Sequence, residues 1–357
     1  MARVMVMAAT KKGLFILESD ERREQWDVRG PFCESWDLMD AAYDPTSGTI
    51  YASGQSGWYG PAVWRSRDMG ETWTHSSQGL TYGDEGPTIG KLWNVTCAHG
   101  SVYVGADPAG LFRSDDGGDS FVHVAGLRNH PTRPEWSPGN GGLCLHTIVP
   151  HPTDPRQIWV AASAVGCFYT ADGGETWETR NQGIRAEYFP GYEAKEVGYC
   201  VHKIAMAPGN PEVLYQQSHQ GVYRTDDGGR HWEWLSDGLP STFGFPIAVH
   251  PHDPKTAYVI PLAEDASRVS IGASAAVWRT RDGGSSWERL SQGLPQHGAY
   301  LSVLREAMST DTLPDPGVYF GTSTGQLFAS RDGGDTWNLL AEFLPPIAGV
   351  EAVVVND

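Results

Sequence analysis

Two Cys-x-His motifs are the first candidates for chemistry in this chain. Cys144 and His146 form one motif, and Cys200 and His202 form the other. Because residues i and i+2 of a β-strand lie on the same face, each thiol would lie beside its imidazole. Thiolate and imidazole groups bind divalent transition metals, so His146 and His202 are candidate ligands in a metalloenzyme. Without a metal they would be catalytic or substrate-binding groups, or buried histidines hydrogen-bonded to their neighbours.

A further metal ligand would have to come from a loop. His219 and His130 are the two histidines that loops could bring to the same place. A structural zinc site takes four protein ligands and a catalytic site takes three. A divalent metal ion is the one cofactor that these residues suggest.

The predicted loops also carry carboxylates and aromatic side chains. Glycoside hydrolysis uses a pair of carboxyl groups, and aromatic rings offer flat faces for stacking against a sugar. Taken singly, each acidic residue would more often be a solvated loop charge. The substrate-binding candidates are Asn94, Asp107, Trp136, Glu187, Tyr188, Tyr199 and His219.

An eight-residue sequence that recurs along the chain must position these residues. Its clearest copy, TADGGETW, occupies 170–177, and an eroded copy at 19–26 has Glu21 at the Asp position. The Asp carboxylate can accept N–H groups within a tight turn, and the glycine supplies the positive φ that the turn needs. We therefore interpret the Asp residues of the six intact copies as structural. They are Asp68, Asp116, Asp172, Asp227, Asp282 and Asp332.

The copies recur at intervals of roughly 50 residues, which indicates a repeat architecture. They resemble the Asp boxes, or BNR repeats, of the sialidase-like β-propeller superfamily. The resemblance implies a propeller fold, but non-catalytic propellers of that superfamily carry the box as well. True sialidases have an Arg-Ile-Pro motif that does not occur in this sequence, so we do not expect a sialidase.

Two other groups of proteins are similar to this chain in their boxes and seven blades. Xyloglucan-cleaving endoglucanases pair two propellers around a cleft, whereas this sequence supplies one. Photosystem II assembly factors share the seven-bladed plan without being hydrolases. The resemblance therefore leaves both an enzyme and a binding protein open.

Each repeat carries four short β-rich segments separated by turns, which predicts a four-stranded antiparallel blade. The N-terminal segment supplies only three strands, and the C-terminal run 350–355 supplies the missing inner one. Joining the two ends closes the ring and removes its open edges. We predict an all-β, seven-bladed β-propeller that forms a single domain over 1–357. The predicted blades are 2–30 plus 350–357, 36–78, 92–126, 143–182, 199–238, 245–293 and 300–343.

The long insertions are predicted to lie on one face of the propeller. If the box joins the third and fourth strands of a blade, the turns between the first and second strands share its face. The insertions fall in the remaining connections, on the opposite face. Elaboration of one face of a rigid scaffold indicates where binding occurs. The insertions are 54–61, 78–90, 127–142, 183–198 and 261–275.

Aligning the inner strands on their Pro-containing ends places one position of each blade around the central channel. In blade order these are Glu351, Met39, Asn94, His146, His202, Phe245 and Arg305. Arg305 and Glu351 would form a structural ion pair, or Arg305 would bind an anionic substrate group with Glu351 as base. His146, His202, Arg305 and Glu351 are the predicted catalytic residues.

The composition of the chain limits the classes of partner that it is expected to bind. The 357 residues carry a net charge of −17, which disfavours nucleic acid and anionic membranes. Five cysteines without a Cys-x-x-Cys motif do not indicate a disulfide framework. The apolar N-terminal run is typical of a strand rather than of a signal peptide. We expect a cytoplasmic protein.

These observations favour a carbohydrate-active enzyme, either a glycoside hydrolase or a lyase, whose site surrounds the channel on the loop-rich face. The ligand would be a small molecule or a glycan. One alternative is a non-catalytic scaffold that binds a protein or a glycan. A second alternative is a metalloenzyme that uses His146 and His202.

Overall fold

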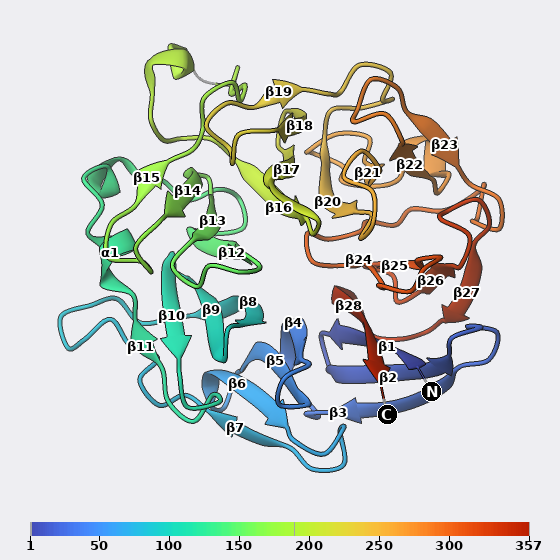
Figure 1. Ribbon diagram of the computed structural model, residues 1–357, viewed down its shortest axis with the longest axis horizontal. Coiled ribbons are helices and arrows are strands. Elements are labelled where there is room, and N and C mark those ends of the chain that lie inside the picture. Colours follow the sequence, from blue (N-terminus) through green and yellow to red (C-terminus); the bar gives the residue numbers. More distant parts are fainter. Residues whose placement is uncertain (1, 189, 357) are drawn as a thin grey trace.

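The protein is described by a computed structural model that covers residues 2–188 and 190–356. Seven four-stranded antiparallel sheets form a ring around a central axis (Figure 1). The prediction of an all-β, seven-bladed β-propeller is therefore confirmed. Within the described residues, no helix is long and apolar enough to cross a membrane.

The strands of each blade follow one another from the axis outward. Blade 1 contains β28 (Ile347–Asn356), β1 (Ala2–Thr10), β2 (Gly13–Asp20) and β3 (Asp27–Phe32). Blade 2 contains β4 (Asp37–Asp44), β5 (Thr49–Ser56), β6 (Gly60–Ser66) and β7 (Thr74–Ser76). Blade 3 contains β8 (Lys91–Ala98), β9 (Ser101–Asp107), β10 (Gly110–Ser114) and β11 (Val122–His123). Blade 4 contains β12 (Cys144–Pro150), β13 (Ile158–Ser163), β14 (Gly166–Thr170) and β15 (Glu178–Thr179).

The other three blades have the same order. Blade 5 contains β16 (Val201–Ala207), β17 (Asn210–Ser218), β18 (Gly221–Thr225) and β19 (Glu233–Trp234). Blade 6 contains β20 (Gly244–Val249), β21 (Ala257–Pro261), β22 (Val277–Thr280) and β23 (Glu288–Leu290). Blade 7 contains β24 (Met308–Thr310), β25 (Val318–Gly321), β26 (Leu327–Ser330) and β27 (Asn338–Ala341). The loops contain the helix α1 (Ala125–Arg128) and the 3-10 turns η1 (Arg133–Glu135), η2 (Tyr192–Ala194) and η3 (Ile271–Ala273).

The two ends of the chain close the ring within blade 1. β28 pairs antiparallel with β1 along its whole length, from Ala2 opposite Asn356 to Thr10 opposite Ile347. The two termini consequently lie side by side (Figure 1). Because the inner strand of blade 1 comes from the C-terminal segment, blade 1 has four strands like the other blades. The predicted closure is confirmed.

Each Asp box is a self-contained turn. In blade 4, Asp172 Oδ1 accepts hydrogen bonds from Thr170 Oγ1 (2.7 Å) and Thr176 N (3.0 Å), and Oδ2 accepts one from Thr176 Oγ1 (2.5 Å). The Trp177 indole N–H donates to the carbonyl of Gly174 (3.0 Å). Equivalent bonds surround the Asp in every intact box. The carboxylates therefore organise turns, as the sequence predicted.

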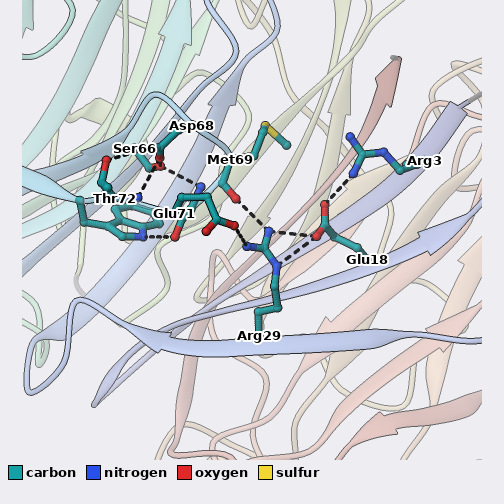
Figure 2. Close-up of polar contacts among 10 residues, drawn as sticks. Arg3, Glu18, Arg29, Ser66, Asp68, Met69, Glu71 and Thr72 are labelled. Carbon is teal, nitrogen blue, oxygen red and sulfur yellow. Dashed lines mark hydrogen bonds and ion pairs between the residues drawn. The ribbon is translucent and has the colours of Figure 1, made fainter.

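The box of blade 2 also binds blade 1 (Figure 2). Nη2 of Arg29 donates to the carbonyl of Met69 (2.8 Å) and to Glu18 Oε2 (2.9 Å). Nη1 of Arg29 lies 3.5 Å from Glu71 Oε1. Glu18 Oε1 in turn accepts a hydrogen bond from Arg3 (3.2 Å). A single guanidinium thus connects neighbouring blades.

The eroded seventh copy of the box has a different role. Arg23 occupies the position of the box glycine, with a φ of 55°. Its Nη1 lies 2.9 Å from Asp311 Oδ2 of blade 7, and the two side chains are only 8% and 0% exposed. Tyr319 donates its hydroxyl to the same oxygen (2.7 Å). In place of an Asp-centred turn, this copy supplies Arg23 to a buried ion pair between blades 1 and 7.

The boxes and the longest loops lie on opposite faces. In blade 4 the box residue Gly173 donates its N–H to the carbonyl of Arg156, in the turn between the first two strands (2.8 Å). Because strands alternate in direction, all remaining connections lie on the other face, which we call the loop face. Its longest connections are 77–90, 124–143, 180–200, 262–276 and 291–307.

Candidate functional site

The inner strands of blades 2 to 5 each carry a β-bulge where they enter from the loop face, and the inner strands of blades 1 and 6 also shift register there. In blades 2 to 5 the bulged residues, which the second strand skips, are Met39, Trp93, His146 and His202. A bulge turns the side chain away from the regular ladder. His146 and His202 therefore occupy equivalent positions, but the predicted alignment was wrong for Asn94 and Glu351. Asn94 follows its bulge, Glu351 pairs with Met7 deeper in blade 1, and Arg305 precedes β24 instead of lying in it.

His202 is buried at the start of β16. Its Nδ1 lies 2.6 Å from the carbonyl oxygen of Gly244, and its Nε2 lies 3.6 Å from Cys200 Sγ. The rings of Phe243 and Phe245 pack on it, with centroids 5.5 and 4.8 Å away. Because a carbonyl oxygen can only accept, Nδ1 carries the proton and Nε2 presents its lone pair.

His219 approaches the same place from the loop between β17 and β18. Its Nε2 lies 3.3 Å from Asp265 Oδ2, and its backbone N–H donates to the carbonyl of Cys200 (2.8 Å). The ring of Tyr188 contacts it edge-on at 5.5 Å. The Tyr188 hydroxyl accepts a hydrogen bond from Cys200 N and donates to Gly198 O, each at 3.0 Å. The 180–200 loop is thereby fixed to the start of β16.

His146 is fully buried in β12, where its Nδ1 lies 3.0 Å from Thr147 Oγ1. The guanidinium of Arg305 lies over the rings of Phe245 (5.1 Å) and Trp93 (5.7 Å). Burial and the positive charge of Arg305 hold the pKa of His146 and of His202 well below the usual range. Both imidazoles are therefore neutral and can act as a ligand or a base.

The group of side chains that could hold a metal differs from the predicted one. In the described part of the chain it consists of Cys200, His202 and His219, whose ligand atoms lie within 4.8 Å of one another. His146 is not part of this group. His130, the other loop histidine, packs against Phe168 in blade 4. The site therefore comes from blade 5 and its loops instead of from two equivalent histidines of adjacent blades.

A polar network lies deeper along the axis, and of its members the sequence predicted only Asn94 and Glu351. Lys203 forms an ion pair with Glu306. Asp40 accepts a hydrogen bond from Asn94 Nδ2 (2.6 Å), and Glu351 accepts one from Ser309 Oγ (3.3 Å). Lys203, Asp40 and Asn94 each directly follow a bulged residue. A polar side chain at that offset in successive inner strands was the signal that could have revealed them.

This network contains more carboxyl groups than basic groups: Lys203 faces Glu306, Asp40 and Glu351. Burial raises the pKa of Asp40 to about 7, with Lys203 opposing the shift. Burial, reinforced by the neighbouring Asp40, raises the pKa of Glu351 to about 7. Because Lys203 is already paired with Glu306, it cannot neutralise both remaining carboxylates. These groups are therefore proton-binding near neutral pH.

Several predicted substrate-binding residues have other roles. Trp136 is 8% exposed and donates its indole N–H to Thr132 Oγ1 (3.0 Å), and Tyr199 is 3% exposed. The Tyr199 hydroxyl lies 2.7 Å from the carbonyl of Tyr192 and holds the 180–200 loop together. Both side chains are almost wholly buried, so they mainly hold the loops in place.

The other predicted residues differ in exposure. Glu187 is exposed, and its backbone N–H donates to Gln220 Oε1 (2.6 Å). Asp107 is partly buried at the end of β9 on the loop face, and burial raises its pKa with Lys91 opposing the shift. Asp107 and Tyr188 therefore remain the best placed of the predicted loop residues.

Exposed aromatic side chains gather on the loop face. Among the described residues, all the large aromatic side chains that are exposed lie in its connections. One of them, Tyr300, borders a cavity of about 680 Å³ that is also lined by Leu294, Phe328 and Gln326. We call this set the exposed aromatics: Trp58, Tyr59, Tyr188, Tyr300 and Phe343.

Known proteins share the Asp-box repeat and the propeller fold with this chain. The BNR/Asp-box repeat family matches residues 168–184, which contain the box of blade 4. A xyloglucanase from Paenibacillus sp is 26% identical in an alignment of 253 residues that covers 64% of this chain. The chain spans only 23% of the length of that relative.

Two solved structures support the same fold. An ancestral GH74 enzyme superposes with a TM-score of 0.56 at 17% identity, covering 88% of this chain and 38% of that chain. YCF48 bound to a D1 peptide superposes with a TM-score of 0.57 at 15% identity, covering 90% and 92%. With its repeated boxes and closed seven-bladed ring, this chain is a β-propeller of the BNR/Asp-box repeat type.

Proposed function

We propose that this chain is a carbohydrate-active enzyme that binds a glycan across its loop face. The observation that carries this proposal is the one-sided distribution of the exposed aromatics. Single exposed apolar side chains are ordinary on a protein surface, but a gathering of rings on one elaborated face is typical of a binding surface. Aromatic rings supply a large, rigid contact area for flat ligands.

The cavity beside Tyr300 suits such a ligand. Its walls are mainly apolar, from Leu294, Leu301 and Phe328, and Thr324 and Gln326 add polar groups. Ligand sites are commonly concave and apolar with a few polar groups that fix orientation. This composition supports binding of a sugar ring through its apolar face, with hydrogen bonds at its edge.

Hydrolysis would use Asp107 as the proton donor. Because burial raises its pKa, this carboxyl keeps its proton to a higher pH than an exposed aspartate, which is what a general acid requires. The catalytic roles predicted for His146, His202, Arg305 and Glu351 stay predictions, which the same assays test.

A glycan panel that includes xyloglucan oligosaccharides tests this proposal, because the similarity to a xyloglucanase makes that substrate the first choice. We expect binding and release of reducing ends. Trp58→Ala and Phe343→Ala should each weaken binding about tenfold, and Asp107→Asn should abolish turnover while binding is retained. Val122→Ala is the matched control, because Val122 is exposed in β11, away from the exposed aromatics. Absence of glycan binding, together with capture of an extended peptide, would favour the non-catalytic scaffold instead.

A further inference from the structure

The ligand atoms of Cys200 and His202 have the spacing of a tetrahedral metal site. Zinc lies about 2.3 Å from a cysteine sulfur and about 2.0–2.1 Å from a histidine nitrogen. At a tetrahedral angle these bond lengths separate sulfur and nitrogen by about 3.6 Å. Cys200 Sγ and His202 Nε2 are 3.6 Å apart. A metal ion could bind both atoms without moving either side chain.

The surroundings of His202 fix the nitrogen that a metal needs. Its Nδ1–H donates to the carbonyl of Gly244 at 2.6 Å, and Phe243 and Phe245 hold the ring in place. Metal-binding histidines almost always donate their other ring N–H to a carbonyl or a carboxylate, which orients the ring. Nε2 therefore faces Cys200 Sγ as an acceptor.

His219 supplies the third ligand and brings its own carboxylate. Its ligand nitrogen lies within 4.8 Å of the sulfur of Cys200 and of the ligand nitrogen of His202, and Asp265 Oδ2 lies 3.3 Å from its Nε2. The hydrogen bond from His219 N to Cys200 O fixes the two loops to each other. A hydrogen bond between a thiol and an imidazole would need only Cys200 and His202. His219 is a third donor, and its pairing with Asp265 is expected of a metal site but not of a simple thiol–imidazole hydrogen bond.

We propose that Cys200, His202 and His219 form a binding site for a divalent transition metal of the zinc type. Three protein ligands leave the fourth tetrahedral position to water or to a ligand, as in catalytic zinc sites. Binding replaces the Cys200 thiol proton, which is released to solvent, by the metal. Asp265 acts as a positioning residue for His219. The metal site borders the glycan surface proposed above, because Tyr188 packs against His219, but its ligands and its test do not depend on that proposal.

Cobalt(II) titration of the full chain, after treatment with a chelator, tests the site directly. We expect one equivalent of Co²⁺ to produce a thiolate-to-cobalt charge-transfer band and the intense visible bands of tetrahedral cobalt. Zinc should displace cobalt and bleach both. Cys200→Ser should abolish the charge-transfer band, and Asp265→Asn should weaken binding about 10- to 100-fold. His219→Ala changes a partly exposed side chain and serves as a second ligand variant if Cys200→Ser fails to fold.

The neighbouring blade offers a matched control. Cys144 belongs to the same Cys-x-His motif in β12 but lies outside the ligand group. Cys144→Ser should therefore keep the charge-transfer band and the affinity of the parent chain. The proposal is overturned if the folded parent chain gives no thiolate band with cobalt, if the band survives in Cys200→Ser, or if Cys144→Ser abolishes it. Circular dichroism of each variant establishes that it is folded.

Discussion

The carboxylate of Asp172 is held by donors from its own turn. Oδ1 and Oδ2 accept hydrogen bonds from the hydroxyl groups of Thr170 and Thr176 and from the amide of Thr176. A carboxylate whose two oxygens already bind its own turn is poorly suited to catalysis. The six box aspartates therefore explain the fold of each hairpin, and the chemistry has to be sought elsewhere.

Removing one box carboxylate should cost stability in a pH-dependent way. The hydrogen bonds from Thr176 lower the pKa of Asp172 to about 2. Because the folded-state pKa is below the unfolded one, the stabilisation is complete above about pH 4 and is lost as the pH falls towards 2. Asp172→Ala should lower the free energy of unfolding by about 1–2 kcal/mol at pH 7, since solvent screens this exposed group.

Denaturant unfolding at pH 7 and at pH 2.5 measures this difference. The gap between Asp172→Ala and the parent chain should shrink at the lower pH. Glu175→Ala changes an exposed carboxylate of the same turn and should stay within about 0.5 kcal/mol of the parent. An equal gap at both pH values would contradict the assignment.

At the scale of strands and loops, the repeat predicted the number of blades. It did not predict the height along the propeller axis at which each inner-strand side chain lies. The box marks one turn in every blade, so counting boxes gives the number of hairpins. The β-bulges at Trp93 and His146 have no sequence signature of their own, and each shifts the register by one residue. Asn94 and Glu351 were consequently placed at the wrong level.

The loops were predictable in position but not in conformation. The long insertions could be assigned to one face because strand direction alternates. That Trp136 and Tyr199 turn back into the core could not be predicted, because loop residues follow no period that separates buried from exposed positions. The sequence suggested Cys200, His202 and His219 as ligands, but preferring them to His146 and His130 required the loop geometry that brings His219 to Cys200.

One blade contact gives a sharp stability prediction. Among the described residues, Arg23 supplies the guanidinium that pairs with Asp311, and both side chains are almost fully buried. Removing one partner of a buried pair leaves an uncompensated charge, so Arg23→Ala should lower the free energy of unfolding by about 3 kcal/mol. Adding Asp311→Asn removes that charge and should restore part of the loss, as a double-mutant cycle would show.

The neighbouring arginine provides the control for this pair. Arg22 is exposed in the same turn, and Arg22→Ala should change the free energy of unfolding by less than about 0.5 kcal/mol. Denaturant unfolding of the four variants at one pH gives all of these values. Strict additivity of the Arg23 and Asp311 substitutions would show that the ion pair does not couple blades 1 and 7.

At the scale of the whole molecule, the ring brings side chains from distant blades to one axis. Asp40 of blade 2, Lys203 of blade 5 and Glu351 of blade 1 influence one another's charge although they are far apart in sequence. Such a group forms only when the ring closes. The pH dependence of stability near neutrality should therefore report on the closed ring, whereas the box aspartates dominate it at acidic pH.

Replacing Glu351 by glutamine should stabilise the ring at alkaline pH. The pKa of Glu351 is raised to about 7 by burial, so its contribution to stability falls as the pH rises from its unfolded pKa to about 7. Glu351→Gln removes this loss while keeping an acceptor for Ser309, and its advantage over the parent chain should be about 2 kcal/mol larger at pH 8 than at pH 5. Glu306→Gln is the opposing control. It deprives Lys203 of its partner and should destabilise the protein at pH 8. Denaturant unfolding at the two pH values decides the matter, and a pH-independent effect of Glu351→Gln would mean that this carboxyl does not titrate in the ring.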